Sequence, residues 1–272
     1  MAPYLTASNS HGKSFMHPRD PLRIIQFTDT HIFATGDEHL DGVNTLTSFR
    51  QVVSLACRNH WPADAVVVTG DLVHDPTPAA YHLLRRSLTE IEAPVYCIPG
   101  NHDDPTLMAE ILPGDNIHVV QNACIGGWHL IFLNTYVPGW EGGHLDEAGL
   151  RSLEACLQTY PQKPTLICLH HSPVPIQSRW LDAMAVDNSP AFFAILDCFT
   201  QVRAVIWGHI HQEFSKMRNG VQLLGSPSTC VQFRPNVAAY AKDRKQAGYR
   251  WLVLEPGGRI ETGIERLEDR CG

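Results

Sequence analysis

Residues 95–103 read Val-Tyr-Cys-Ile-Pro-Gly-Asn-His-Asp, an apolar run that passes directly into polar side chains. The run Val95–Ile98 predicts a short buried strand, and the Pro-Gly pair that follows predicts the turn that ends it. Asn101 and His102 therefore lie just beyond the carboxyl end of a strand. A Gly-Asn-His-Asp sequence also occurs in plain turns, so this stretch needs support from the rest of the chain.

The same arrangement, in which an apolar strand passes into Asp or His, recurs elsewhere. The predicted strands are residues 22–27, 65–69, 165–169 and 204–207, and the polar residues that follow them are, in order, Asp29 and His31, Asp71, His170 and His171, and His209 and His211. Taken singly, a histidine after a strand is usually a satisfied polar residue, and a Gly-Asp pair is usually a turn. In open α/β sheets, however, the carboxyl ends of the strands line the ligand crevice. We therefore expect these side chains to converge on one site.

Helices alternate with these strands, and the last third of the chain is rich in strands. Helical spacing of apolar residues predicts helices over residues 45–59, 78–92, 146–159 and 189–200, the first of them capped by Asn44. Further strands are expected over residues 117–121 and 129–134, and antiparallel ones over 221–224, 249–255 and 259–265. This order predicts an α/β fold in four layers, an α/β/β/α sandwich with two central mixed sheets. We expect one domain over residues 21–272 and a flexible tail over residues 1–20.

Composition limits the function. The 272 residues carry a net charge of −7, which argues against a nucleic-acid partner because such a partner needs a basic track. A small phosphate substrate remains compatible with this charge, since bound metal ions supply local positive charge. The eight cysteines include no C-x-x-C pair, and neither a signal peptide nor a run long enough to span a membrane is present. We therefore expect reduced thiols, a cytoplasmic location, no membrane partner, and a monomer or dimer.

The polar residues suit a pair of metal ions. Asp, His and Asn offer oxygen and nitrogen donors, a mixture that fits Fe, Mn, Zn or Co better than Ca. Two adjacent metals need a carboxylate that bridges them, and Asp71, alone after its strand, is the candidate. If the segment after the first strand is extended, Asp29 and His31 point to the same side and share one metal. His209 and His211 have the same spacing, and we expect one of them at each metal.

These motifs together resemble a known family. Asp29-x-His31, Gly70-Asp71, Gly100–Asp103, His170-His171 and Gly208-His209-x-His211 are similar, in this order, to the motifs of the calcineurin-like metallophosphoesterases, over roughly residues 22–265. The resemblance implies that Asp29, His31, Asp71 and His211 hold the first metal. It implies that Asp71, Asn101, His170 and His209 hold the second, with His171 beside the ligands rather than among them. Iron or manganese is the expected metal, and zinc, cobalt or magnesium would also fit.

Other stretches resemble one particular group within this family. Residues 27–34, 40–45, 178–182, 208–213 and 226–233 are similar to the CpdA group of bacterial 3′,5′-cyclic AMP phosphodiesterases. This similarity implies hydrolysis of cyclic AMP to 5′-AMP by a hydroxide that bridges the two metals. The residues expected to be catalytic are Asp71 and His102, and those expected to contact the substrate are Asn101 and His102. His102 would donate a proton to the leaving oxygen.

Three questions stay open at this point. The substrate could be another diester, such as a glycerophosphodiester, or a broad range of diesters. The chain could also be a non-catalytic interaction scaffold, although none of the seven expected ligands is missing. Trp180 and Phe233 could line the substrate site or could belong to the packed core.

Overall fold

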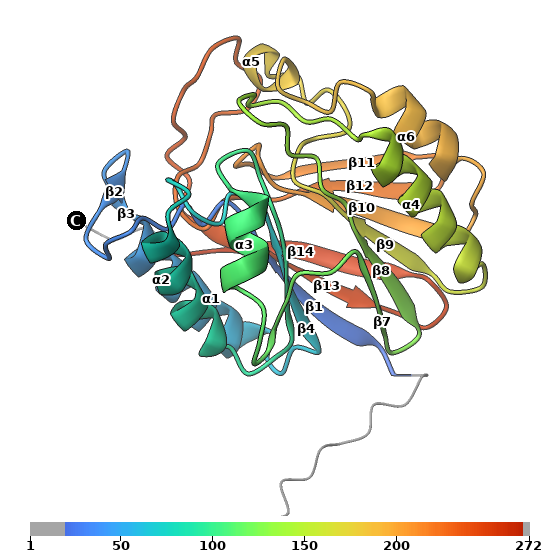
Figure 1. Cartoon of the computed structure of the whole chain (residues 1–272), viewed down its shortest axis with the longest axis horizontal. Helices are drawn as coiled ribbons and strands as arrows, with labels where there is room; N and C mark the ends of the chain where they lie inside the picture. Colours follow the sequence, from blue (N-terminus) through green and yellow to red (C-terminus); the bar gives the residue numbers. More distant parts are fainter. Residues whose placement is uncertain (1–19, 269–272) are drawn as a thin grey trace, which may run out of the picture.

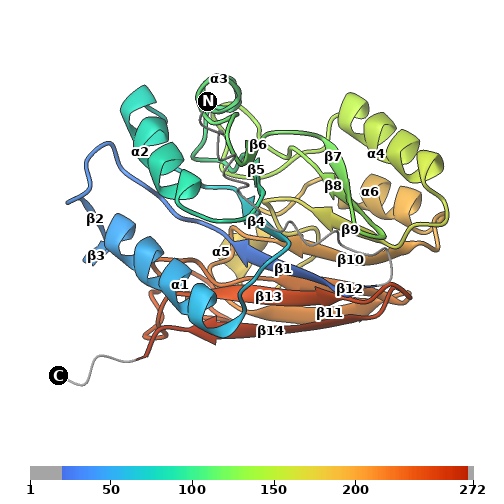
Figure 2. The ribbon, with the colours of Figure 1, turned by 90° about the horizontal axis from the view of Figure 1, so that it is seen from below.

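The computed structural model describes residues 20–268, so nearly all of the tail expected over residues 1–20 lies outside the described residues. Two six-stranded sheets face each other at the centre of the molecule (Figure 1). Helices α1, α2 and α3 cover the outer face of one sheet, and α4 and α6 cover the outer face of the other (Figures 1 and 2). The predicted four-layer α/β/β/α sandwich is confirmed. Within residues 20–268 no helix has both the length and the apolar character needed to cross a bilayer.

The first sheet has the strand order β14-β13-β1-β4-β5-β6. Its strands are β1 (Leu22–Phe27), β4 (Ala65–Thr69), β5 (Val95–Ile98), β6 (Ile117–His118), β13 (Gly248–Leu254) and β14 (Ile260–Arg266). Strands β1, β4, β5 and β6 are parallel, whereas β13 and β14 run antiparallel to their neighbours. Strand β4 is buried along its whole length, as its β-branched sequence predicts for a strand covered on both faces.

The second sheet has the order β11-β12-β10-β9-β8-β7. Its strands are β7 (Asn122–Ile125), β8 (Trp128–Phe132), β9 (Thr165–Cys168), β10 (Val202–Trp207), β11 (Phe214–Arg218) and β12 (Val221–Gly225). Strands β8, β9, β10 and β12 are parallel, with antiparallel β7 and β11 at the edges. The expectation that residues 221–224 form an antiparallel strand is therefore only half correct, because β12 pairs in parallel with β10. A small hairpin, β2 (His39–Leu40) and β3 (Val43–Asn44), precedes the first helix.

Side chains cap four of the six helices in the described chain, α1 to α4. The helices are α1 (Thr45–Asn59), α2 (Pro78–Thr89), α3 (Pro105–Ile111), α4 (Glu147–Thr159), α5 (Arg179–Asp182) and α6 (Ser189–Leu196). The Asn44 side chain accepts a hydrogen bond from the backbone N–H of Thr47 at 2.8 Å, which confirms it as the cap of α1. Helices α2 and α6 end earlier than predicted, at residues 89 and 196 instead of 92 and 200.

Buried hydrogen bonds join the two sheets beneath the edge at which the polar residues gather. Arg250 Nε donates to Ser226 Oγ at 3.0 Å, and Ser226 Oγ donates to Gln26 Oε1 at 2.6 Å. Gln26 Nε2 then donates to Thr69 Oγ1 at 2.8 Å and to the carbonyl of Trp207 at 3.2 Å. Because Thr69 and Trp207 end strands of different sheets, this network fixes those strand ends relative to each other.

Candidate metal centre and active site

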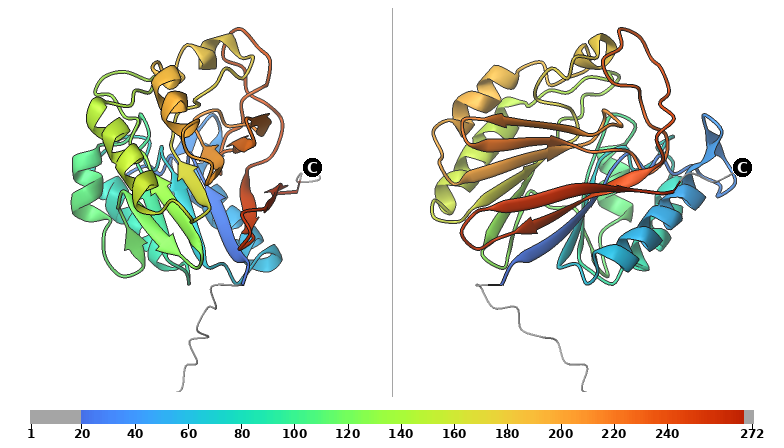
Figure 3. Two further views of the ribbon diagram at one scale, coloured as in Figure 1. Left: turned by 90° about the vertical axis from the view of Figure 1, so that its right-hand side faces the viewer. Right: turned by 180° about the vertical axis from the view of Figure 1, so that it is seen from behind.

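The expected site residues converge at one edge of the sandwich. Strands β1, β4 and β5 belong to the first sheet, and β9 and β10 belong to the second, yet all five end at this edge. The residues that follow them are Asp29 and His31, Asp71, Asn101 and His102, His170 and His171, and His209 and His211. Figure 3 shows the long connection between β12 and β13 arching over the same edge toward α5.

Asp29, His31, Asp71 and His211 form a first group, whose ligand atoms all lie within 4.8 Å of one another. His31 Nε2 lies 3.6 Å from Asp71 Oδ2, and His211 Nε2 lies 3.3 Å from Asp29 Oδ1. The two imidazole nitrogens are 3.4 Å apart. All four residues are buried.

Asp71 also belongs to a second group, which includes Asn101, His170 and His209. Its other oxygen, Oδ1, lies 3.3 Å from His170 Nε2. Asn101 Oδ1 lies 3.1 Å from His170 Nε2 and 3.1 Å from His209 Nδ1. One carboxylate therefore faces both groups, which is the arrangement that two adjacent cations require. The two histidines of the Gly-His-x-His motif lie in different groups.

The backbone around these residues is not extended, contrary to the expectation for the segments after β1 and β10. The φ angles of Asp29, His31, Asp71, His209 and His211 lie between 45° and 64°. Such left-handed conformations are unfavourable for residues other than glycine and tend to occur at functional sites. Asp29 and His31 are nevertheless in one group, because the backbone of this segment is bonded to the loop after β4: Asp29 N–H donates to Gly70 O at 3.0 Å and His31 N–H to Asp71 O at 2.9 Å.

Backbone carbonyls orient two of the imidazole rings. His170 Nδ1–H donates to Thr69 O at 2.8 Å, and His211 Nδ1–H donates to Val231 O at 2.8 Å. A carbonyl only accepts, so the proton of each neutral ring sits on Nδ1 and the lone pair of Nε2 points into the site. This is the usual way in which proteins prepare a histidine for metal binding.

The charges of the site also suit cations. Burial lowers the pKa of His31 well below its usual value, and burial with the neighbouring His170 lowers that of His209 to about 3. Burial would raise the pKa of Asp71, but His170 and His31 hold it well below its usual value. Burial opposes protonation of His170, yet Asp71 and Asp29 raise its pKa to about 9. The site thus combines ionised carboxylates with the neutral imidazoles of His31 and His209. His170 keeps a proton at neutral pH, and a metal ion would replace it.

His171 does not offer a free nitrogen to a metal. Its Nε2–H donates to the carbonyl of Glu141 at 3.2 Å, and its Nδ1 accepts from Thr135 Oγ1 at 2.7 Å. It also lies close to His170 and His209. That His171 supports the ligands rather than joining them stays a prediction.

Asp103 and His74 are site residues whose roles were not predicted from the sequence. The buried carboxylate of Asp103 accepts from the backbone N–H groups of Leu72, Val73 and Gly100, and so ties the loop after β4 to the loop after β5. Burial, with Asp71 nearby, raises the pKa of Asp103 to about 6. The carbonyl of His74 accepts a hydrogen bond from His102 Nδ1–H at 3.0 Å. The other ring nitrogen of His102, Nε2, takes no part in this bond.

A cavity of about 310 Å³ opens over the two groups, which is within the usual range for a small ligand. Its floor includes Asp71, Asn101 and His102, and none of its lining residues in the described chain is Lys or Arg. A phosphate in this cavity would be repelled by the carboxylates unless metal ions were bound, so the donor set and its charge both fit a binuclear centre.

Three aromatic rings form a wall of this cavity. Trp180 comes from α5, and Phe233 and Tyr240 come from the connection between β12 and β13. The ring centroids lie 5.1 Å apart for Trp180 and Phe233, 5.5 Å for Trp180 and Tyr240, and 5.4 Å for Phe233 and Tyr240. Phe233 also stacks on His211 at 4.0 Å. Trp180 and Phe233 thus line the cavity while also packing on neighbouring residues.

The fold and the paired donor groups define a metallophosphoesterase, and sequence comparison agrees. A family model described as calcineurin-like phosphoesterase matches residues 22–213. The chain belongs to the calcineurin-like phosphoesterase family.

Among its relatives are two proteins named 3′,5′-cyclic adenosine monophosphate phosphodiesterase CpdA. The protein from Pseudomonas aeruginosa is 37% identical over 246 residues, which are 90% of each chain. The protein from Escherichia coli K12 is 37% identical over 249 residues, or 91% of this chain and 90% of its own. A 3′,5′-cyclic-nucleotide phosphodiesterase from Nostoc is 37% identical over 93% of this chain and 95% of its own.

Solved structures share the fold at low sequence identity. A dimetal phosphatase from Danio rerio has a TM-score of 0.59 and 16% identity, covering 92% of this chain and all of its own. A Thermus thermophilus protein has a TM-score of 0.58 and 15% identity, covering 89% of this chain and 98% of its own.

Proposed function

We propose that this chain is a metal-dependent 3′,5′-cyclic nucleotide phosphodiesterase that hydrolyses cyclic AMP to 5′-AMP. The observation that carries the proposal is the cavity, which has a floor of oxygen and nitrogen donors and a wall of aromatic rings. The donors suit a phosphodiester and the rings suit a nucleobase. The names and coverage of the similar bacterial proteins support this substrate class.

In this proposal two metal ions are held by the two donor groups. Asp29, His31, Asp71 and His211 hold one ion, while Asp71, Asn101, His170 and His209 hold the other. When bound, the ions lower the pKa of a water molecule and neutralise the negative charge of the phosphate oxygens. The mixed oxygen and nitrogen donors favour iron or manganese, with zinc, cobalt or magnesium as other ions that fit.

His102 serves the leaving group. Its backbone N–H donates to Asp71 Oδ1 at 2.9 Å, which ties this residue to the carboxylate that both donor groups share. Because Nδ1–H is bonded to the carbonyl of His74, Nε2 is the nitrogen that faces the cavity. The water oxygen bonds to phosphorus and releases one proton to the solvent, while the bond from phosphorus to the 3′ oxygen breaks. Protonated His102 gives its proton to that 3′ oxygen and is protonated again from the solvent. Asn101, beside it, binds both a metal and the substrate phosphate.

The aromatic wall holds the nucleoside part of the substrate. A base can stack on Trp180, Phe233 or Tyr240. The Trp180 Nε1–H is buried and has no hydrogen-bond partner within residues 20–268. An unpaired buried donor is unfavourable, so an acceptor on the substrate would gain free energy by bonding to it.

We also propose that the enzyme works in the cytoplasm as a monomer or dimer, with residues 21–272 forming one domain. The cysteines among residues 20–268 are all free, and Cys57, Cys124 and Cys198 are exposed. Exposed free thiols persist in a reducing compartment, which supports this location.

Steady-state kinetics on a defined panel test the proposal. Protein loaded with manganese or iron would be assayed on cyclic AMP, cyclic GMP, a glycerophosphodiester, an aryl diester and a phosphomonoester. We expect cyclic AMP to give 5′-AMP with the highest kcat/KM of the unactivated substrates, and the monoester to be poor. A kcat/KM about tenfold higher for the glycerophosphodiester would overturn the cyclic nucleotide assignment and leave the phosphoesterase assignment standing.

A further inference from the structure

A second cavity, of about 670 Å³, is larger than the one over the metal centre. Three stretches line it: residues 39–51 at the start of α1, residues 230–234, and residues 242–247. The catalytic residues take no part in its lining. We call it the basic cavity because of the side chains described next.

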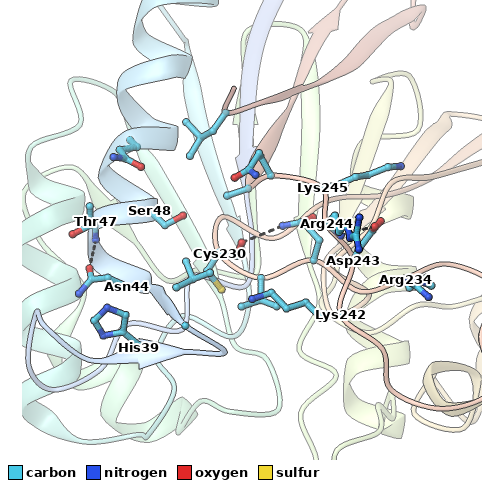
Figure 4. A pocket seen from close by; sticks show the side chains of 18 residues that line it. His39, Asn44, Thr47, Ser48, Cys230, Arg234, Lys242, Asp243, Arg244 and Lys245 are labelled. Carbon is cyan, nitrogen blue, oxygen red and sulfur yellow. Dashed lines mark hydrogen bonds between the residues drawn. The ribbon is translucent and has the colours of Figure 1, made fainter. Parts of the chain in front are cut away.

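Four cationic side chains line the basic cavity: Arg234, Lys242, Arg244 and Lys245. The only carboxylate among its lining residues in the described chain is that of Asp243. Figure 4 shows the cationic residues gathered along one side, facing His39, Asn44 and Thr47 across the cavity. The chain as a whole has a net charge of −7, so this local excess of positive charge indicates a site that could attract an anion.

No ion pair within the described residues neutralises these positive charges. Among residues 20–268 the ion pairs of Lys and Arg involve Arg85, Arg151, Arg218 and Arg259, so none uses a cation of the basic cavity. The ammonium group of Lys242 donates to the backbone carbonyl of Asp41 at 2.5 Å, which holds it in place without cancelling its charge. Cations that line the same cavity repel one another, and a bound anion would relieve this repulsion.

The opposite side of the cavity is polar but uncharged. Thr47 and Gln51 lie in the first two turns of α1 and are exposed, so their hydroxyl and amide groups can reach a ligand. Apolar surface from Val43, Val231 and Leu267 completes the lining. The volume lies within the usual range for small-molecule sites and leaves room for more than a phosphate ion.

We infer that the basic cavity binds a phosphorylated small molecule with a di- or triphosphate group, such as a nucleoside diphosphate. The cationic side fits the phosphates, and the apolar and amide groups fit the rest of the molecule. A nucleic acid would need a continuous basic track, whereas these four cations line a single cavity, which suits a small ligand.

A ligand here would contact the wall of the catalytic cavity. Val231 lines both cavities, and neighbouring residues alternate between them: His39 faces the basic cavity, whereas Leu40 and Asp41 face the catalytic one. Cys230, which lines the basic cavity, lies with Sγ 3.4 Å from the backbone carbonyl of Asp29. The site is therefore placed to respond to a phosphorylated metabolite and to influence substrate binding.

Isothermal titration calorimetry tests the inference, with ADP and inorganic tripolyphosphate as probes, both added as magnesium complexes to metal-loaded enzyme. The double variant Arg244→Ala/Lys245→Ala removes two exposed cations that have no role in the catalytic cavity. Its matched control, Arg203→Ala/Lys216→Ala, removes two exposed cations of the second sheet and changes net charge equally. The variant Trp180→Ala reports binding in the catalytic cavity.

We expect the double variant to weaken the binding of both probes about tenfold or more, while the control and Trp180→Ala bind them as the wild type does. Hydrolysis of cyclic AMP without probe should be unchanged in the double variant. Tighter binding of ADP than of tripolyphosphate would show that the nucleoside contributes, and equal binding would show that the phosphates suffice. Binding that survives in Arg244→Ala/Lys245→Ala but is lost in Trp180→Ala would place the probes in the catalytic cavity and overturn the inference, as would no measurable binding.

Discussion

At the scale of single residues, His102 offers a clear separation of metal binding from chemistry. Replacing it by alanine should leave both metals bound, because its bond to Asp71 uses the backbone N–H and not the ring. The loss should fall on kcat for cyclic AMP and amount to ~10²–10⁴-fold, the usual worth of general acid catalysis. An aryl diester, whose leaving group needs little protonation, should lose much less. The measurements are kcat on both substrates and metal content by elemental analysis.

The control for His102→Ala is His82→Ala, because His82 is an exposed histidine on α2, outside the site. Its kinetics should match those of the wild type. If His102→Ala slows both substrates equally while folding and metal content are intact, His102 does not protonate the leaving group. Its role would then be limited to electrostatic stabilisation of the phosphate.

Single residues also show what the sequence could and could not predict about the site. Asp71 and His170 were predictable because each directly follows a buried strand, and strand ends have a fixed place in a sheet. The left-handed backbone of Asp29 was not predictable, because it depends on a hydrogen bond from Asp29 N–H to Gly70 O, which is distant in the sequence. Asp103 stands in the quoted Gly-Asn-His-Asp motif, yet only the structure shows that it binds backbone groups of two loops.

At the scale of elements, the aromatic wall predicts an effect on substrate affinity. Trp180→Ala, on the short helix α5, should raise KM for cyclic AMP by ~10-fold, because stacking on an aromatic ring is worth about 1–3 kcal/mol per base. The value of kcat should change little, since the ring does not touch the reacting atoms. The KM of Trp180→Phe should lie between those of the wild type and Trp180→Ala, because phenylalanine keeps a stacking surface but lacks the indole N–H. Steady-state kinetics on cyclic AMP give both constants.

Met217→Ala is a control for the loss of a large apolar side chain, because Met217 is exposed on β11 and lies outside this cavity. A Trp180→Ala enzyme with unchanged KM for cyclic AMP would show that Trp180 does not hold the base, and an accompanying loss of stability would show that its ring is core packing. A fall in kcat alone would point instead to a disturbed metal centre.

Strand β8 contains a buried histidine that should make stability depend on pH. Burial, with Lys163 nearby, lowers the pKa of His129 from 6.5 to about 4. Its Nε2 lies 3.3 Å from Asn122 Oδ1, and its Nδ1 is buried without a partner in the described chain. The unfolded chain therefore binds more protons than the folded one between these two values. The contribution of neutral His129 to the free energy of unfolding is fully present above pH 6.5 and is lost as the pH falls toward 4.

The test compares thermal unfolding at about pH 7.5 and at about pH 5. His129→Gln keeps a donor for Asn122 but cannot titrate, so the variant should lose less stability on acidification, by up to ~2 kcal/mol. His82→Gln, at an exposed position, should behave as the wild type does. If His129→Gln and the wild type lose the same stability between these two pH values, protonation of His129 costs the folded state little free energy.

The elements that were hard to predict are short or lie at edges. Strand β11 is mostly exposed, so the alternation that marks a half-buried strand is missing from Phe214–Arg218. Helix α3 has only seven residues, too few for a clear helical period, although Asp104 caps it and Pro105 begins it. By contrast, β4 is buried along its whole length and α1 has 15 residues with one buried face, and the predicted bounds of both match the structure.

At the scale of the whole molecule, the proposed metal ligands come from both sheets. Asp29, Asp71 and Asn101 follow strands of the first sheet, while His170 and His209 follow strands of the second. Metal binding therefore adds free energy to the packing of the two sheets as well as to catalysis. Because a ligand that binds only the folded state stabilises it by mass action, chelation should lower Tm.

We expect removal of the metals to abolish hydrolysis and lower Tm by about 5–15 °C, given ~4 kcal/mol from tight metal binding and a few degrees per kcal/mol. Two metals per chain should be found before chelation, and adding manganese or iron should restore both Tm and activity.

The variant Asp71→Ala should lose metal from both sites, because Asp71 faces both donor groups. A chelator should therefore barely change the Tm of this variant. His211→Ala, which removes a ligand of one group only, should show an intermediate change. An Asp115→Ala control, at an exposed carboxylate paired with Arg85, should respond to chelator as the wild type does. If Asp71→Ala retains two metals by elemental analysis, Asp71 is not the shared ligand, and the two groups do not form one binuclear centre.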